Sequence, residues 1–104
     1  MPNLTISRHD ATGPQGGSEV TLALGGDLDN TTAGLLDAPL AEALASQPAA
    51  LLFDLAALRL ITSAGIRRFA HAIKQQKARQ AATQFLHPQP PVRDALAMCL
   101  IPLH

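Results

Sequence analysis

Residues 50–66 read ALLFDLAALRLITSAGI, and this stretch decides the fold class of the chain. It opens with the apolar run 50–55, interrupted only by Asp54. A short apolar run of this kind is typical of a strand buried on both faces, which lies in the middle of a sheet covered by helices. The stretch closes with Thr62-Ser63-Ala64-Gly65, where a helix is expected to begin.

That helix is expected over residues 64–80. Its apolar positions have the i, i+3, i+4, i+7 spacing of one buried face, and they are Ile66, Phe69, Ala70 and Ile73. Beyond it, the sequence predicts a strand at residues 83–86, a break at the prolines of 88–91 and a third helix at 92–98.

Towards the N-terminus, period-two alternation predicts strands at residues 4–8 and 19–24. The loop between them, residues 11–18, is rich in Gly, Pro and Ser, so the two strands are expected to form a hairpin. Gly25 and Gly26 are expected to stop the second strand.

Residues 29–32 (Asp-Asn-Thr-Thr) are typical helix-capping side chains, and a helical pattern follows them. Pro39 lies inside this pattern, where a helix interior would lose about 3 kcal/mol. We therefore expect either a kink there or a helix that begins only at residues 37–39. Strands alternating with helices indicate an α/β architecture with parallel central strands, in a single domain over residues 1–104.

Composition excludes several classes of function. The chain has 104 residues, 47% of them hydrophobic, no net charge, three Phe and no Trp or Tyr. These values argue against a nucleic-acid surface, which needs a basic field or exposed rings. There is no apolar signal core or membrane-length segment, and one cysteine cannot form an internal disulfide. The sequence thus predicts a cytoplasmic protein without membrane insertion or direct nucleic-acid contact.

The charges are unevenly distributed. Seven of the eight acidic residues lie in the first 54 positions, and six of the eight basic residues lie between 59 and 79. Such a distribution suits a charged protein partner, and it also suits an ordinary solvated helix face.

Ser63 has several interpretations on spacing alone. A serine between a strand and a helix is often an N-cap. A nucleophile elbow would need glycine two residues before it, where Ile61 stands. The four histidines are scattered and no phosphate-binding loop is present, so the sequence gives little support for an enzyme. Asp27 and Asp29 would share one side of an extended segment, and ordinary turn chemistry also explains them.

Two segments together resemble STAS domains, the fold of anti-sigma factor antagonists. Residues 54–66 are similar to the family signature, in which an apolar strand ends in Asp-Leu and a Thr-Ser-Ala-Gly-type turn opens a helix. Residues 26–29 (Gly-Asp-Leu-Asp), followed by Thr32, are similar to a second family segment. The resemblance implies a four- to five-stranded mixed sheet with three to four helices packed mainly on one side.

The resemblance also implies a function. Ser63 would be phosphorylated by an anti-sigma factor that is a serine kinase, and a PP2C-type phosphatase would reverse this. Binding to the kinase would free the sigma factor and regulate transcription, with ATP and Mg²⁺ held by the kinase and no cofactor in this chain. A weak homodimer is a further expectation. The partner-binding residues would be Asp27, Asp29, Asn30, Thr32, Thr62, Ser63, Ala64, Gly65, Arg67 and Arg68.

The chain departs from the common family pattern at a few positions. Thr62 stands where Asp is frequent and is an alternative phosphoryl acceptor. Arg67 and Arg68 replace small or apolar residues, so they could hold a phosphate or meet an acidic partner. Members of the family also serve in stress-signalling complexes and on the ATPase of lipid-transport ABC complexes, which gives a second candidate role.

Overall fold

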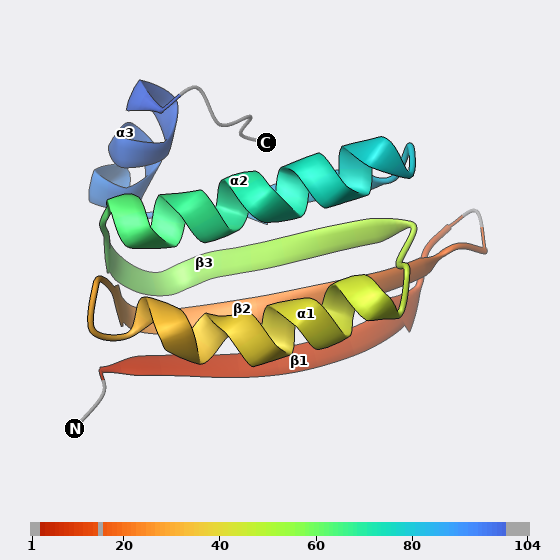
Figure 1. Cartoon of the computed structure of the whole chain (residues 1–104), viewed down its shortest axis with the longest axis horizontal. Coiled ribbons are helices and arrows are strands. Elements are labelled where there is room, and N and C mark those ends of the chain that lie inside the picture. The colour runs from red at the N-terminus through yellow and green to blue at the C-terminus, as the bar shows by residue number, and fades with distance from the viewer. Residues whose placement is uncertain (1–2, 15, 100–104) are drawn as a thin grey trace.

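The computed structural model describes residues 3–14 and 16–99. Strands and helices alternate along the chain after an initial hairpin (Figure 1). The elements are β1 (Leu4–Thr12), β2 (Ser18–Leu28), a 3₁₀ helix η1 (Ala33–Leu36), α1 (Asp37–Ala45), β3 (Ala50–Ile61), α2 (Ser63–Ala78), β4 (Ala82–Leu86) and α3 (Pro90–Met98).

The four strands form one mixed sheet in the order β1-β2-β3-β4. β1 and β2 are antiparallel, whereas β2, β3 and β4 run parallel to one another. Figure 1 shows α1 and α2 side by side in front of the sheet. Both helices connect parallel neighbours, and the right-handed rule for such connections places them on the same face. The expected mixed sheet with helices mainly on one side is confirmed.

The core lies between this face of the sheet and the helices. Its centre is the three phenylalanines, one each from β3, α2 and β4, all fully buried. The ring centroids of Phe53 and Phe69 are 4.7 Å apart, those of Phe69 and Phe85 5.0 Å, and those of Phe53 and Phe85 5.2 Å. Val92 and Leu96 of α3 join the same core.

All four strands are longer than the sequence predicts, β4 by one residue and the other three by four or more. β1 continues to Thr12, and β3 continues six residues beyond the apolar run to Ile61. The prediction that Gly25 and Gly26 end the second strand is wrong, because β2 passes through them to Leu28. These glycines lie where the β2–β3 register shifts, and Gly26 has a φ of +91°, which glycine adopts without strain.

The central position of β3 is confirmed, but its burial on both faces is not. Leu51, Phe53 and Leu55 are fully buried, whereas Leu52 and Asp54 are only half-buried. The reason is that α1 and α2 cover one face of the sheet and leave the opposite side of β2 and β3 less covered (Figure 1).

The helix after residues 29–32 begins at Asp37, as one of the two expectations had it. Pro39 is its third residue, where a backbone N–H would have no intrahelical acceptor in any case, so the proline does not interrupt the helix. Thr32 is the N-cap residue of η1, but neither η1 nor α1 has a side-chain N-cap hydrogen bond, so the expected capping by side chains of residues 29–32 is not found. No helix among the described residues is long and apolar enough to cross a membrane.

Candidate functional site

The parallel pairing of β2 with β3 brings the two motif segments together. Leu28 pairs with Ile61 at the carboxyl end of both strands, and the Thr62 N–H donates to the Leu28 carbonyl at 3.0 Å. The turn after β2 and the start of α2 therefore emerge next to each other. Loops at the carboxyl ends of neighbouring parallel strands are a common place for functional sites.

Asp29 closes the turn after β2. Its Oδ1 accepts hydrogen bonds from the Thr31 hydroxyl at 2.7 Å, the Thr31 N–H at 2.9 Å and the Thr32 N–H at 3.2 Å. These bonds, above all that of the Thr31 hydroxyl, hold the pKa of the Asp29 carboxyl below its ordinary value because they favour the charged form. The carboxylate thus organises the turn.

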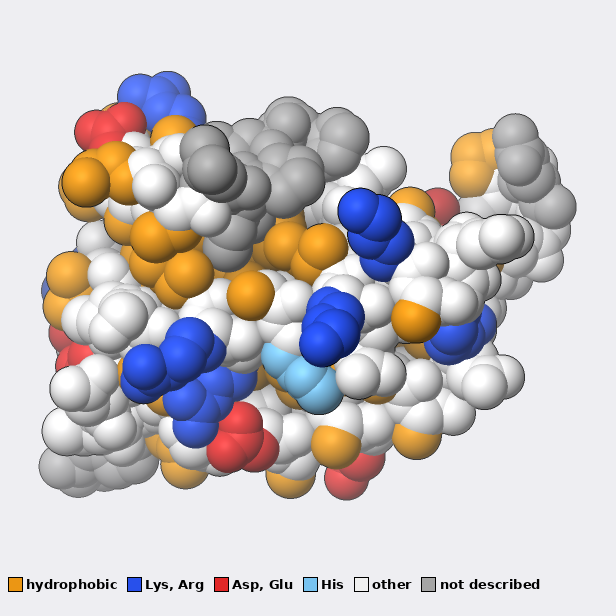
Figure 2. All heavy atoms as spheres, turned by 45° about the horizontal axis from the view of Figure 1, so that its top comes forward, with side chains coloured by type: hydrophobic (Ala, Val, Ile, Leu, Met, Phe, Trp, Pro, Cys, Tyr) orange, Lys and Arg blue, Asp and Glu red, His pale blue; other side chains and the backbone are white. Residues whose placement is uncertain are grey.

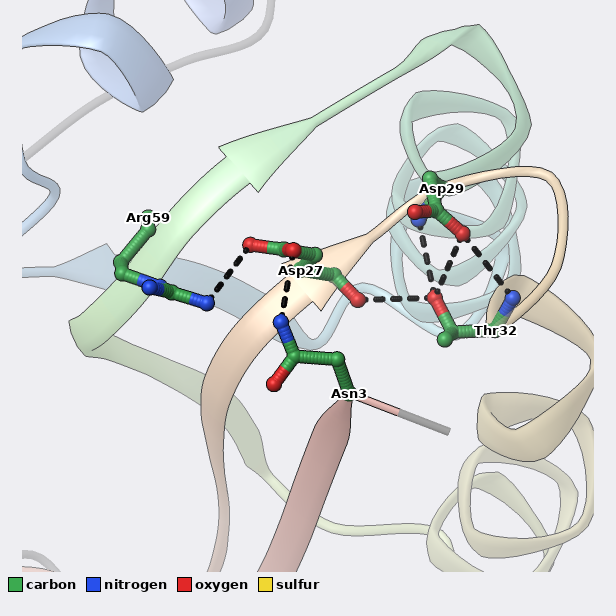
Figure 3. Close-up of polar contacts among 5 residues, drawn as sticks. All are labelled: Asn3, Asp27, Asp29, Thr32 and Arg59. Carbon is green, nitrogen blue, oxygen red and sulfur yellow. Dashed lines mark hydrogen bonds and ion pairs between the residues drawn. The ribbon is translucent and has the colours of Figure 1, made fainter. Parts of the chain in front are cut away.

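Thr32 ties this turn back to the strand (Figure 3). Its hydroxyl donates to the Asp27 carbonyl at 2.7 Å and accepts from the Asp29 N–H at 2.9 Å. The same hydroxyl lies 3.2 Å from Asp29 Oδ1. Thr32 is almost completely buried, so its polar atoms need these partners. The threonine is a structural part of the site.

The Asp27 carboxylate has different partners from that of Asp29. Its Oδ2 accepts from Asn3 Nδ2 at 2.7 Å, and its Oδ1 lies 3.4 Å from Arg59 Nη2 (Figure 3). The Arg59 side chain is 62% exposed, and screening by water keeps such an ion pair weak. The two carboxylates share no partner, although the Thr32 hydroxyl contacts the Asp27 carbonyl as well as Asp29.

Ser63 is the first residue of α2 and its side chain is exposed. The N-cap is Thr62, which makes no side-chain capping bond, so the interpretation of Ser63 as an N-cap is wrong. None of the hydrogen bonds found among the described residues involves the Ser63 hydroxyl. Thr62 is half-buried, and its hydroxyl lies 3.5 Å from Asn30 Oδ1 at the limit of a hydrogen bond.

Ala64 and Gly65 are both buried beneath this helix start. A Cβ at Gly65 would come within 2.6 Å of Leu28 Cγ and 3.0 Å of Ile61 Cγ1. Glycine is therefore required for α2 to begin close against the ends of β2 and β3, which in turn presents Ser63 to solvent. The two residues support the site from below.

Arg67 and Arg68 have different environments. Arg68 donates from Nε to Asp37 Oδ1 at 3.1 Å and from Nη1 to the Ala64 carbonyl at 3.0 Å. It therefore links α1 to the first turn of α2. Arg67 is exposed and forms no ion pair among residues 3–14 and 16–99.

The family model described as "Mlab, STAS domain" matches residues 12–99. The chain belongs to the STAS domain family. A comparison with curated proteins gives no match. Similar solved structures share the STAS fold at low sequence identity. An anti-sigma factor antagonist from Mycobacterium paratuberculosis has a TM-score of 0.83 and 21% identity, covering 97% of this chain and 85% of its own.

Two further structures are those of the anti-sigma factor antagonist SpoIIAA. The unphosphorylated form has a TM-score of 0.76 and 18% identity, covering 96% of this STAS domain and 88% of its own chain. The phosphorylated form, from Bacillus, has a TM-score of 0.70 and 17% identity, covering 91% and 83%. At these identities the likeness shows the fold alone.

Sequence reasoning missed several residues around the STAS motif segments. Asn3, Arg59 and Asp37 are the partners of predicted site residues, and these contacts become visible only in the folded structure. Leu35 and Leu60 are 45% and 44% exposed, each three residues from a predicted site residue. Strand alternation could have found Leu60, because its neighbour Ile61 faces the core.

No histidine among the described residues forms a catalytic group with Ser63. His71 lies eight residues further along α2, or about 12 Å at 1.5 Å per residue. No hydrogen bond joins Ser63 to a histidine in the described part of the chain. The geometry gives a Ser–His mechanism no support.

Proposed function

We propose that this STAS domain is an anti-sigma factor antagonist that binds an anti-sigma factor kinase and is switched off by phosphorylation at Ser63. A PP2C-type phosphatase would restore the binding form. One observation carries the proposal: an exposed serine opens α2 directly beside the Asp29 turn, at the place where the family motif has its phosphoryl acceptor.

The position of Ser63 suits a phosphoryl acceptor. Its exposed hydroxyl is accessible to a kinase, whereas the hydroxyl of Thr32 is almost completely buried. A phosphate there would lie at the N-terminus of a 16-residue helix, whose dipole and free N–H groups favour an anion. Arg67 is four residues further on, which places it on the same helix face as Ser63.

The chemistry of the transfer needs an external base. The Ser63 Oγ–H bond is replaced by an Oγ–P bond, ADP leaves from ATP, and the hydroxyl proton passes to a group of the kinase. Asp29 is a poor candidate for that base, because its hydrogen bonds from Thr31 and Thr32 lower the pKa of its carboxyl. Asp29 instead shapes the turn next to the acceptor.

Phosphorylation would act on binding more than on folding. It adds about −1.5 to −2 charges at an exposed site. Repulsion of an anionic partner surface and the cost of desolvating the phosphate weaken the complex, and about 1.4 kcal/mol is a tenfold change in affinity. SpoIIAA, which has been solved in unphosphorylated and phosphorylated forms, supports the idea that this fold accepts a phosphate.

The experiment is phosphoryl transfer in vitro. The protein is incubated with ATP, Mg²⁺ and the candidate anti-sigma factor kinase, and the modified residue is mapped by tandem mass spectrometry. We expect one phosphoryl group at residue 63, none in Ser63→Ala, and no change of site in Thr62→Val. Phosphate on Thr62 in the parent would reassign the acceptor.

Binding is tested with a matched pair of variants. Ser63→Asp should lose affinity for the kinase by about tenfold or more while its melting temperature stays within a few degrees of the parent. Ser18→Asp places the same charge at an exposed serine at the start of β2 and should bind normally. Equal binding by both variants would contradict the proposal.

A second candidate is a regulatory or scaffold role in another assembly, such as a stress-signalling or lipid-transport ABC complex. The observation that favours it is the description of the matching family model, which names Mlab and no antagonist. Stable co-purification with a transporter ATPase, together with no transfer of phosphate to residue 63, would support this role over the first.

A further inference from the structure

A groove of about 380 Å³ lies between α1 and α2, and Ser63 is not among the residues that line it. Its α1 side is largely apolar, with Leu40, Ala41 and Leu44. Its α2 side is cationic or titratable, with Arg67, Arg68 and His71, and Asp37 closes one end. This volume lies at the lower end of the range of about 300–1,000 Å³ for ligand pockets, so the groove admits a few apolar side chains.

The positive charge beside the groove is only partly neutralised within the chain. Arg68 is paired with Asp37 at 3.1 Å, but Arg67, Lys74 and Lys77 form no ion pair among the described residues. Figure 2 shows Lys and Arg side chains gathered along α2, with the histidine between them. Each residue of an α-helix is rotated by about 100° from the one before it. Arg67 and Lys74 therefore lie on the side of α2 next to the groove, whereas Lys77 lies on a side that faces away from it.

We propose that this groove is a docking surface for an acidic amphipathic helix of a protein partner. Leucine-type side chains of that helix would enter over Leu40, Ala41 and Leu44, while its carboxylates would face Arg67 and Lys74. Helix-in-groove recognition uses this combination of an apolar stripe and charged flanks. The inference rests on the proposed function in one respect: both require that this domain binds a protein partner. It does not require that Ser63 is phosphorylated.

The shape of the surface favours a helix over a membrane. Adsorption to a bilayer requires an amphipathic helix that presents large apolar residues to the lipid. The exposed large hydrophobics of the described residues are Leu35, Leu60 and Met98, and none belongs to α2. The apolar atoms here lie in a recess behind a cationic rim, and a protruding side chain reaches them more readily than a lipid surface.

The test uses a synthetic probe helix with leucines at i, i+3, i+4 and i+7 and glutamates on its flanks. Its binding to the full chain is measured by fluorescence anisotropy at low and high salt. We expect saturable one-to-one binding that weakens with salt, since the charges at the rim are exposed to solvent. A control peptide with lysines in place of the glutamates should not bind.

Two matched pairs of variants locate the binding surface. Arg67→Glu should lower the affinity for the probe helix by about tenfold or more. Lys77→Glu, on the same helix of the protein, should lower it by less than about threefold. Ala41→Glu fills the groove with a negative charge and should abolish binding. Ala38→Glu is the same change at an exposed position of α1 outside the groove and should leave binding intact. Circular dichroism checks that each variant is folded.

Several outcomes would overturn the inference. One is equal weakening by Arg67→Glu and Lys77→Glu, which indicates a diffuse charge effect. Another is binding to vesicles of phosphatidylglycerol and phosphatidylcholine without binding to the probe. A third is a dimer that Ala41→Glu dissociates in analytical ultracentrifugation, which would make a second copy the occupant. Normal phosphorylation at Ser63 alongside any of these results leaves the proposed function standing.

Discussion

At Gly65, a single methyl group decides whether α2 can begin where it does. The residue packs on Leu28, which is fully buried, and on Ile61, which is 7% exposed. Neither neighbour can move into solvent to make room. The exposed Ser63 hydroxyl thus depends on a residue that has no functional group of its own.

Gly65→Ala should therefore destabilise the protein in spite of the better helix propensity of alanine. Overpacking costs about 1–3 kcal/mol and the propensity gain is about 1 kcal/mol, so we expect a net loss of up to about 2 kcal/mol. Urea denaturation measures it. Gly34→Ala is the control, because a Cβ there meets nothing within 4 Å. A Gly65→Ala protein as stable as the parent would show that β2 and α2 are less tightly packed.

The charge of Asp29 should make folding stability depend on pH. Its folded pKa lies below the unfolded value of about 4, chiefly because of the Thr31 hydroxyl. The stabilisation is therefore complete above the unfolded pKa and is lost as the pH falls through the folded pKa. Urea midpoints measured from neutral to acidic pH should show a smaller acid-induced loss in Asp29→Asn than in the parent.

Asp10 is the control for this titration. Its pKa is also lowered, by a hydrogen bond from Arg8, but it lies in β1 away from the candidate site. Asp10→Asn should remove its own part of the pH dependence and leave that of Asp29. If the urea midpoints of Asp29→Asn and the parent depend on pH in the same way, the hydrogen bonds in the turn do not stabilise the charged carboxyl over the neutral one.

The helices and strands show which local signals in the sequence were sufficient to predict them. Helical periodicity placed α2 within two residues at its C-terminus, although Ala70 of the predicted buried face is exposed. Period-two alternation found β1 and β2, and a short apolar run found β3. Strand ends were less predictable. Gly25 and Gly26 look like a stop, yet β2 continues through them because the β2–β3 register shifts there, and only a pairing partner reveals that.

In the candidate site, too, local features were predictable from the sequence and long-range contacts were not. The motif residues at 26–32 and 62–65 are recognisable in sequence, and the fold brings them together at the ends of β2 and β3. The bonds of Asp27 to Asn3 and Arg59 and of Arg68 to Asp37 were not predictable. They join residues 24 to 32 positions apart, and nothing local specifies such pairs.

Gln76 is the polar residue that fastens the C-terminal half of α2. It is fully buried, and its Nε2 donates to the Pro48 carbonyl at 3.1 Å and the Ala82 carbonyl at 3.0 Å. Its Oε1 accepts from Arg79 at 2.8 Å. One side chain thus joins α2 to the chain segments that lead into β3 and β4.

Gln76→Leu should cost about 2–4 kcal/mol of folding free energy, because it removes three hydrogen bonds of a buried side chain and leaves the Pro48 carbonyl with only the 3.3 Å bond from Arg79 Nη1. Thermal and urea unfolding measure this loss. Gln75→Leu, at the neighbouring exposed position, controls for the change of residue type and should be nearly neutral. Similar losses in both variants would mean that the buried amide contributes little.

At the scale of the whole molecule, stability and recognition use different surfaces. Both helices that connect parallel strands lie on one side of the sheet, and the core is packed between them and the strands (Figure 1). The candidate site and the groove lie on the outside of this layer, where Ser63, Arg67 and Ala41 are all exposed. Charge changes at these positions can therefore alter binding without removing core contacts.

The three phenylalanines provide the corresponding test of the core. Phe53 contacts the rings of Phe69 and Phe85, so Phe53→Ala opens a cavity shared by β3, α2 and β4. We expect a loss of about 3–5 kcal/mol, a large part of the about 5–15 kcal/mol that stabilises a typical domain. Met98→Ala, at a side chain that is 85% exposed, should change stability by less than about 0.5 kcal/mol. Urea denaturation followed by circular dichroism gives both values. A loss below about 1 kcal/mol for Phe53→Ala would mean that the layer repacks around the missing ring and that the rings are not the centre of the core.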